Sequence, residues 1–267
     1  MEDNSLFWDI LLNNYQTNLL IFARVIGIFA FNPIFARRNT PTQIKVGASL
    51  ALTIFIAASV AKGQSVPEYT SLGAFAVAVL FEAFIGFALG FLTQLFLSTL
   101  LVAGDIMDTQ SGLGMAKIYD PASGLQMPLF GSITTYMFIL YFFVTNAHLS
   151  YIKIFALSFK AIPVGTQSID PNAGMTIVNY FGTVLTLAMK IAIPMIAAQL
   201  ILEFCLGILM KTVPQVQVMV VNIQVKLLFA LLLLFLLAHP MSDAIERYMD
   251  TMLQSLEGVL GLISKSG

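Results

Sequence analysis

The chain has 267 residues, of which 58% are hydrophobic and only 10% are charged, with a mean hydropathy of +0.87. Soluble domains are about 45–50% apolar and about 25% charged, so charges this sparse cannot cover a water-exposed surface, and hydrocarbon is the natural solvent. The net charge of −1 offers no basic surface for nucleic acid.

The N-terminal flank sets the expected orientation. Its first fourteen residues carry acidic side chains but no Lys or Arg, which is the wrong sign for a secretory signal peptide. The first apolar run is therefore expected to stay in the mature protein. The next connection carries Arg37, Arg38 and Lys45. The positive-inside rule then predicts that the N-terminus is outside and that this connection is cytoplasmic.

Apolar runs that reach about 20 residues predict membrane helices. Alternating segments of the β-barrel type are absent, and the last run is followed by an amphipathic tail over Ser242–Ile263. We therefore predict an all-α, polytopic membrane protein with about six long, partly kinked or hairpin helices and a C-terminal amphipathic helix. The apolar runs are Tyr15–Phe35, Ile44–Ala61, Gly73–Ala103, Leu129–Val144, Met175–Met210 and Val218–Ala238.

Two of these runs exceed the thickness of a bilayer. Gly73–Ala103 and Met175–Met210 would measure about 46 and 54 Å as helices, against about 30 Å of hydrocarbon. Strong tilt, a kink or a folded-back hairpin must absorb the excess, and Pro194 is the predicted bend in the second run. Two ordinary tilted spans remain the alternative.

Small and polar residues recur every fourth position in the third run. Small residues let another backbone approach closely, and Glu82 cannot face lipid cheaply. The stripe predicts packing against a neighbouring subunit or against the chain's own helices; a proton-carrying carboxylate of a transporter is a further alternative. Its members are Ala74, Ala78, Glu82, Gly86, Gly90, Gln94 and Ser98.

The stretch 104–124 combines glycines, which are typical of loops, with apolar side chains. Gly104, Gly112, Gly114 and Gly124 free the backbone, whereas a mobile loop normally avoids displaying apolar groups to water. Methionine is flexible and fills irregular gaps. The pattern fits a compliant plug inside a cavity, or equally an ordinary loop resting on the membrane surface.

Charges inside the apolar runs are few. Arg24, Lys190 and Glu203 are predicted to be buried polar residues that pair or face a polar cavity, although the pairing cannot be read from one sequence. Lys211 lies near a helix end, from which it can reach the interface.

The tail is predicted to be a helix that Ser242 or Asp243 caps after Pro240. A helix that lies on a membrane surface is usually rich in Lys and Arg on its polar face. Here that face is mostly acidic, with Glu246, Asp250 and Glu257. The pattern therefore favours docking on a partner protein.

Catalytic patterns are absent from the sequence. The single cysteine and the two separated histidines form no metal set, and H-E-x-x-H, G-x-S-x-G and P-loop motifs are missing. No enzyme activity and no cofactor are expected.

Several segments in order resemble the FliR family, the export-gate membrane proteins of bacterial flagella, and their type III secretion counterparts. The likeness covers about residues 20 to 230. The residues that carry it are Arg24, Asn32-Pro33-Ile34 and Pro41; Glu82, Gly86 and Gly90; Gly104-Asp105, Asp108, Gln110, Gly112 and Asp120-Pro121; His148, Ser158-Phe159 and Pro163-Val164-Gly165; and Leu206-Gly207, Val213-Pro214-Gln215 and Lys226.

The resemblance implies a single export-gate domain over 1–267, with a FliP-like front over about 1–175 and a FliQ-like back over about 176–267. It implies FliP-like and FliQ-like partners, FlhB-like and FlhA-like export components, and unfolded export substrates, in the bacterial inner membrane at a flagellar basal body or injectisome base. It also implies bent, hairpin-like helices.

Site residues follow from the same resemblance. The pore plug would consist of Ile106, Met107, Leu113, Met115, Ile118 and Tyr119. Subunit or helix packing would involve Glu82, Gly86, Gly90, Gln94, Pro214 and Gln215. Lys211 and Gln217 depart from the family pattern around Pro214, and the plug lacks the family's phenylalanines.

The function that the resemblance implies is a non-enzymatic subunit that helps enclose and plug the pore for unfolded substrates. A secondary transporter of a small solute or ion is the alternative. It would need converging ionisable residues and commonly two related halves, and no internal repeat is visible in the sequence.

Overall fold

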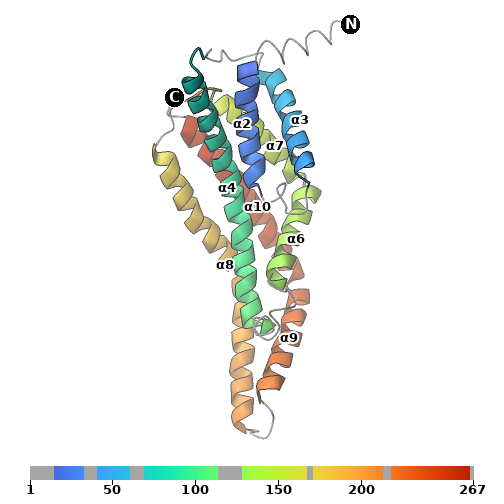
Figure 1. Ribbon diagram of the computed structural model, residues 1–267. Coiled ribbons are helices and arrows are strands. Elements are labelled where there is room, and N and C mark those ends of the chain that lie inside the picture. The colour runs from blue at the N-terminus through green and yellow to red at the C-terminus, as the bar shows by residue number, and fades with distance from the viewer. Residues whose placement is uncertain are drawn as a thin grey trace. The chain divides into compact units, whose positions relative to one another are not determined.

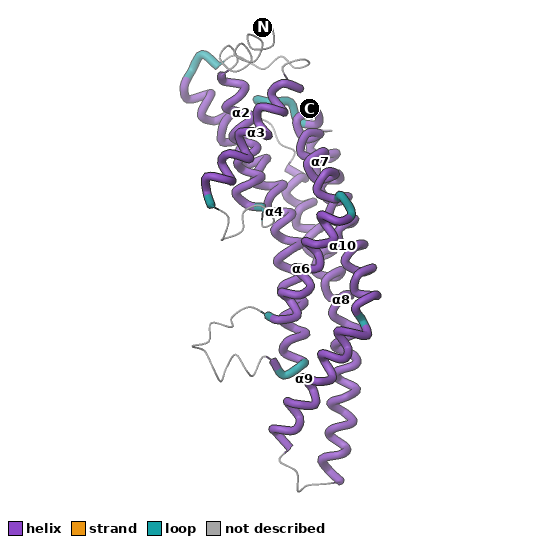
Figure 2. Tube along the Cα trace, turned by 90° about the vertical axis from the view of Figure 1, so that its right-hand side faces the viewer, coloured by secondary structure: helices purple, strands orange, loops and turns teal. Residues whose placement is uncertain are grey.

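The computed structural model describes residues 15–32, 41–60, 69–113, 128–166, 171–212 and 218–264. All regular structure in these ranges is helical, with short connections between the helices (Figures 1 and 2). The described helices are α2 (Tyr15–Phe31), α3 (Thr42–Val60), α4 (Leu72–Gln110), α6 (Leu129–Val144), α7 (Ala147–Ala161), α8 (Pro171–Thr212), α9 (Val218–Leu236) and α10 (Ala238–Ser264).

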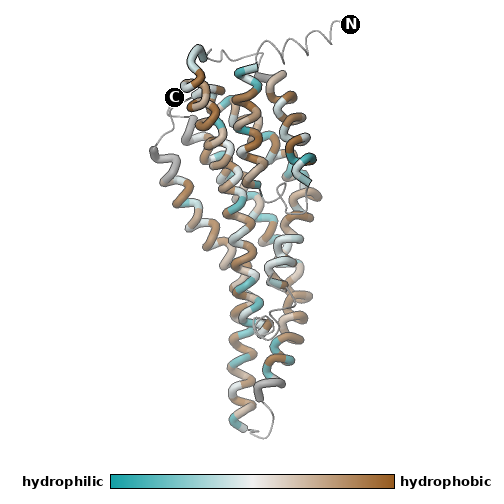
Figure 3. Tube along the Cα trace, viewed as in Figure 1, coloured by the Kyte–Doolittle hydropathy of each residue, from teal (hydrophilic) through white to brown (hydrophobic). Residues whose placement is uncertain are grey.

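The fold is that of a membrane protein. Within the described ranges, α4 and the part of α8 from Met175 are long and apolar enough to cross a membrane. Two bent pairs, α6 with α7 and α9 with α10, raise the number of candidate spans to four if each pair counts as one. Hydrophobic residues predominate along most of these helices (Figure 3).

The two overlong runs are continuous helices. α4 has 39 residues and α8 has 42, and α8 continues through Pro194. The folded-back hairpin considered for each run is therefore wrong. At about 1.5 Å per residue, each helix is longer than the hydrocarbon thickness by more than about 20 Å. Part of each helix must therefore lie outside the hydrocarbon or against protein.

One helix and several helix boundaries differ from the sequence-based prediction. α7 was not predicted, because its Lys153, Lys160 and other polar residues interrupt the apolar pattern; Asn146, with φ of 59°, separates it from α6. α4 continues beyond Ala103 to Gln110. α10 begins at Ala238 and includes Pro240, which is tolerated there because first-turn amides have no partner within the helix.

The chain divides into two compact units. Unit 1 is made from Met1–Leu95, His148–Tyr180 and Met252–Gly267, and unit 2 from Phe96–Ala147 and Phe181–Thr251. The division into a FliP-like front and a FliQ-like back stays a prediction.

Each unit has its own buried core. In unit 1, Leu20, Ile21 and Val25 of α2 pack in one cluster with Ile56 of α3 and Phe159 of α7. In unit 2, the core includes an aromatic cluster whose rings come from three helices. The ring of Tyr248 on α10 meets Phe96 of α4 and Phe138 of α6 edge to face, with centroids 5.3 and 6.3 Å away. Such edge-to-face pairs are a preferred aromatic geometry.

Candidate functional site

A buried ion pair joins α2 to α4 in unit 1. The Nε of Arg24 donates to one carboxylate oxygen of Glu82 at 2.5 Å, and both side chains are 0% exposed. The other carboxylate oxygen accepts the backbone N–H of Gly165 at 2.8 Å. Both oxygens of Glu82 are therefore occupied by donors.

The same arginine also holds the C-terminal end of α7. Its Nη1 donates to the carbonyl oxygens of Ser158 and Ile162, each at 3.0 Å. Its Cζ lies 4.4 Å from the centroid of the Phe159 ring. A cation at a helix C-terminus satisfies unpaired carbonyls and is favoured by the helix dipole. Arg24 and Glu82 thus tie three segments of unit 1 together.

Glycines allow the backbones of α2 and α4 to touch. A methyl group added to Gly86 would overlap the carbonyl oxygen of Arg24, and one added to Gly90 would lie 2.8 Å from that of Ile28. From the other helix, a methyl group on Gly27 would lie 2.6 Å from the carbonyl oxygen of Ala83. Small residues at such a crossing are the device that lets apolar helices approach closely.

A hydrogen-bond chain continues along this part of α4. The side-chain amide of Asn32 donates to the hydroxyl of Tyr151 at 2.5 Å, and this hydroxyl lies 2.7 Å from that of Thr93. Thr93 in turn donates to the carbonyl oxygen of Leu89 at 3.1 Å. Because Asn32, Thr93 and Tyr151 are buried, the chain satisfies polar groups that would otherwise be costly.

Three residues of the stripe on α4 take part in these contacts. Glu82, Gly86 and Gly90 face the chain's own α2, whereas Gln94 is exposed. Since both oxygens of Glu82 hold donors, the geometry gives this carboxylate an architectural role. Within the described residues no group of His, Cys, Asp or Glu could hold a metal ion.

The expected plug residues lie in different places. Ile106 and Met107 belong to the last turns of α4, where Met107 is fully buried in unit 2, and Leu113 follows the helix. Met115, Ile118 and Tyr119 lie outside the described residues. The expectation that Gly104 frees the backbone is wrong: it is a helical residue, and a methyl group on it would overlap the backbone of Gly131.

A carboxylate links the end of α4 to the start of α6. Asp108 is 1% exposed, and its two oxygens accept the backbone N–H groups of Leu129 at 2.5 Å and of Phe130 at 2.9 Å. Gly104 and Gly131 lie at the same contact in unit 2.

A second ion pair joins α8 to α9 in unit 2. Lys226 lies 3.0 Å from Glu203, with side-chain exposures of 12% and 51%. The side-chain amide of Gln199 donates to the carbonyl oxygen of Lys226 at 3.3 Å. Lys190 is exposed, so the expected burial of Lys190 and Glu203 is not seen within this chain. Pro214 and Gln215 lie outside the described residues.

Apolar side chains cover the outward faces of this helix pair. The exposed residues are Leu200, Ile201, Phe204, Ile208 and Leu209 on α8, and Leu228, Leu231, Leu232, Phe235 and Leu236 on α9.

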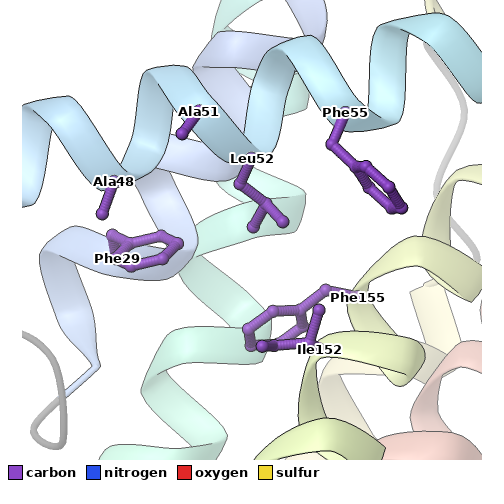
Figure 4. Close-up of a pocket in the computed structure, with 7 residues that line it drawn as sticks. All are labelled: Phe29, Ala48, Ala51, Leu52, Phe55, Ile152 and Phe155. Atoms are coloured by element: carbon purple, nitrogen blue, oxygen red, sulfur yellow. The ribbon is translucent and has the colours of Figure 1, made fainter.

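Unit 1 has an apolar groove with a volume of about 420 Å³. Figure 4 shows Phe29 of α2, Leu52 and Phe55 of α3, and Ile152 and Phe155 of α7 around it. Polar atoms contribute almost nothing to this lining, so the groove suits an apolar occupant and offers no reaction chemistry.

The comparisons with known proteins identify the family. Residues 15–252 match the family model described as "Bacterial export proteins, family 1". The chain belongs to the FliR family of bacterial export proteins. It is similar to the flagellar biosynthetic protein FliR of Bacillus subtilis, with 26% identity covering 96% of this chain and 99% of the relative. For FliR of Escherichia coli, the identity is 32% over 80% of each chain, and for that of Aquifex aeolicus, 27% over 82% and 84%.

FliR-family membership confirms the predicted family, the membrane-protein class and the absence of enzymatic function. The chain is a non-enzymatic component of the flagellar and type III export apparatus, and its membrane-spanning helices place it in the membrane of that apparatus.

Sequence reasoning missed two interactions of this FliR-family chain. The partners of Asp108 lie 21 and 22 residues further along the chain, and no local pattern announces such a contact. Tyr151 was missed together with α7. An available signal was the spacing of Tyr151, Phe155, Ser158 and Phe159, which share one buried helical face.

Proposed function

We propose that this chain is a pore-enclosing subunit of the export gate in the bacterial inner membrane, through which unfolded export substrates pass. FliP-like and FliQ-like subunits cover its outer faces, FlhB-like and FlhA-like components lie next in the apparatus, and lipid covers the smaller share. The N-terminus lies outside. The observation that carries this proposal is the exposed apolar surface of α8 and α9, together with membership in the export family.

The contrast within the molecule supports this assignment. The α2–α4 crossing is completed by residues of the chain itself, whereas the α8–α9 pair leaves large apolar side chains and a half-exposed carboxylate, Glu203, uncovered. Apolar patches of this kind mark protein or membrane contacts, and a charge among them favours protein or water over lipid. Pro214 and Gln215 are proposed to belong to the same subunit contact.

The connection between α4 and α6 is proposed to seal the resting pore. Leu113, Met115, Ile118 and Tyr119 provide the apolar seal, and Ile106 and Met107 form its base on α4. Support comes from the composition of the connection, since flexible methionine and apolar groups adapt to an irregular cavity.

Replacing residues 114–127 with a short Gly-Ser linker tests both parts of this proposal. The variant is co-expressed with FliP-like and FliQ-like subunits, and the recovered complex is reconstituted in dye-loaded vesicles. We expect normal recovery of the complex and faster dye release, because the linker leaves the described helices unchanged but removes the apolar seal. The same linker in place of 61–68, between α3 and α4, is the control and should leave dye release unchanged.

Two results would contradict the proposal separately. Unchanged dye release from the linker variant would argue against the seal. If the unaltered chain failed to co-purify with FliP-like and FliQ-like subunits and worked alone in vesicles, the pore-subunit assignment itself would be wrong.

A further inference from the structure

The apolar groove of unit 1 opens at the surface of the chain. Ala48 and Phe55 of α3 lie at opposite ends of it, and Phe29 of α2 and Phe155 of α7 complete its walls (Figure 4). Ala48 and Ala51 are exposed along the groove, and Phe55 is 70% exposed. A molecule outside the chain can therefore reach the lining.

The outward face of α3 beside the groove has no hydrogen-bonding side chain. From Val46 to Ala58, no exposed residue of this helix is polar. The two hydroxyl groups in this range, those of Ser49 and Thr53, are buried and donate to carbonyl oxygens of α3 itself. Protein interfaces carry about one hydrogen bond per 100–200 Å², so this face suits hydrocarbon better than a partner protein.

The charges next to the groove have one sign. Within their described ranges, α2, α3 and α7 contain no Asp or Glu. Lys45 lies one turn before Ala48 on α3, and the exposed Lys153 directly follows Ile152 on α7. Basic residues at a membrane surface attract anionic lipid headgroups. An apolar groove flanked by lysines is thus complementary to a molecule with an alkyl chain and a negative head.

We propose that this groove binds an acyl chain of an anionic phospholipid, whose headgroup lies at Lys45 and Lys153. An alkyl chain fits a narrow groove between aromatic rings and buries no polar group of its own. In the proposed orientation the connection before α3 is cytoplasmic, so the lipid belongs to the cytoplasmic leaflet. The site requires only that the chain lies in a membrane, and it is independent of the pore.

Site-specific photo-crosslinking tests the proposal in the complex assembled with FliP-like and FliQ-like subunits. The complex is reconstituted in vesicles of equal parts phosphatidylglycerol, which is anionic, and phosphatidylcholine, which is zwitterionic. Phe55→benzoylphenylalanine places the crosslinker at the groove. Leu80→benzoylphenylalanine is the control, because Leu80 is 69% exposed on α4, a helix without Lys or Arg. Mass spectrometry identifies the adducts.

We expect adducts at position 55 to favour phosphatidylglycerol by about fivefold or more, the effect of one lysine near a membrane surface. Adducts at position 80 should show no preference. With K45Q/K153Q the preference at position 55 should fall to about one, because both charges that hold the headgroup are gone.

A second pair of variants tests the groove itself. Ala51→Phe fills the groove from α3 and should lower the phosphatidylglycerol adduct at position 55 several-fold. Ala76→Phe makes the same change at an exposed position of α4 and should leave this adduct unchanged.

Other results would overturn the proposal. Equal adducts of the two lipids at position 55, or a preference that survives K45Q/K153Q, would show that the lysines select no headgroup. An unchanged adduct in Ala51→Phe would show that the acyl chain lies outside the groove. An adduct with a FliP-like or FliQ-like subunit in place of lipid would make the groove a subunit contact.

Discussion

The α2–α4 crossing and the α8–α9 pair use similar residues to different ends. Both are apolar helix pairs with one carboxylate and one cation between them. Arg24 and Glu82 are fully buried and form further hydrogen bonds to the backbone of the chain, whereas Glu203 is 51% exposed beside Lys226. The first pair completes a fold. The second lies on a surface whose apolar side chains are exposed in this chain. The difference shows that a charge within an apolar run does not by itself reveal which role it has.

The largest expected effect comes from breaking the buried pair. Glu82→Ala leaves the guanidinium of Arg24 uncompensated and the N–H of Gly165 without its acceptor, so the free energy of unfolding should fall by about 3–5 kcal/mol. Unfolding of the purified chain by denaturing detergent measures this. The double variant R24L/E82L should be less destabilised than Glu82→Ala, because it removes both charges.

If Glu82→Ala lowered the free energy of unfolding by less than about 1 kcal/mol, the range of exposed ion pairs, the buried pair would not differ from the exposed one. The α2–α4 crossing would then owe its stability to packing alone, and the buried charges would have no special part in it.

A smaller effect is expected from filling the space at the crossing. Gly86→Ala places a methyl group against the carbonyl oxygen of Arg24, so overpacking should cost about 1–3 kcal/mol. Gly207→Ala on α8 is the matched control, because no atom lies within 4 Å of the added methyl group. Both changes gain the same helix propensity of about 1 kcal/mol, so their difference isolates the crossing.

The same detergent titration compares these two variants. Equal stability of Gly86→Ala and Gly207→Ala would mean that α2 and α4 can separate without cost, and the view of unit 1 as a self-contained crossing would have to be given up.

The sequence predicted those parts of the fold that depend on a local pattern within one helix. Apolar runs marked most of the helices. The stripe with four-residue spacing on α4 contained Glu82, Gly86 and Gly90, which contact α2, but its members Ala74 and Gln94 are exposed. It could not show that Arg24 is the partner of Glu82, because their 58-residue separation is set by the packing of α2 on α4. The amphipathic tail was likewise visible in the sequence, but its start at Ala238 was not.

Elements with mixed composition were harder to predict. Polar residues interrupt α7, so a search for long apolar runs passes over it, although Tyr151 and Phe155 pack inside unit 1. Near Gly104 the glycines suggested a free backbone, whereas Gly104 serves a close helix contact instead. Glycine has both uses, and only the neighbouring helix decides between them.

The smallest effect on stability is expected from the exposed ion pair between α8 and α9. Glu203→Gln removes the charge partner of Lys226 while keeping the size of the side chain. In the purified chain the loss should be about 0–1 kcal/mol, because Glu203 is 51% exposed and solvent screens its interaction with Lys226. In the assembled complex the same change should reduce recovery with FliP-like and FliQ-like subunits, since a subunit that covers the pair would leave Lys226 buried without its counter-charge. Lys211→Met, at the exposed C-terminal end of α8, controls for a general change of charge. If Glu203→Gln lowered the free energy of unfolding of the purified chain as much as Glu82→Ala does, the two ion pairs would contribute equally to stability. The proposed difference between the buried α2–α4 crossing and the exposed α8–α9 surface would then be wrong.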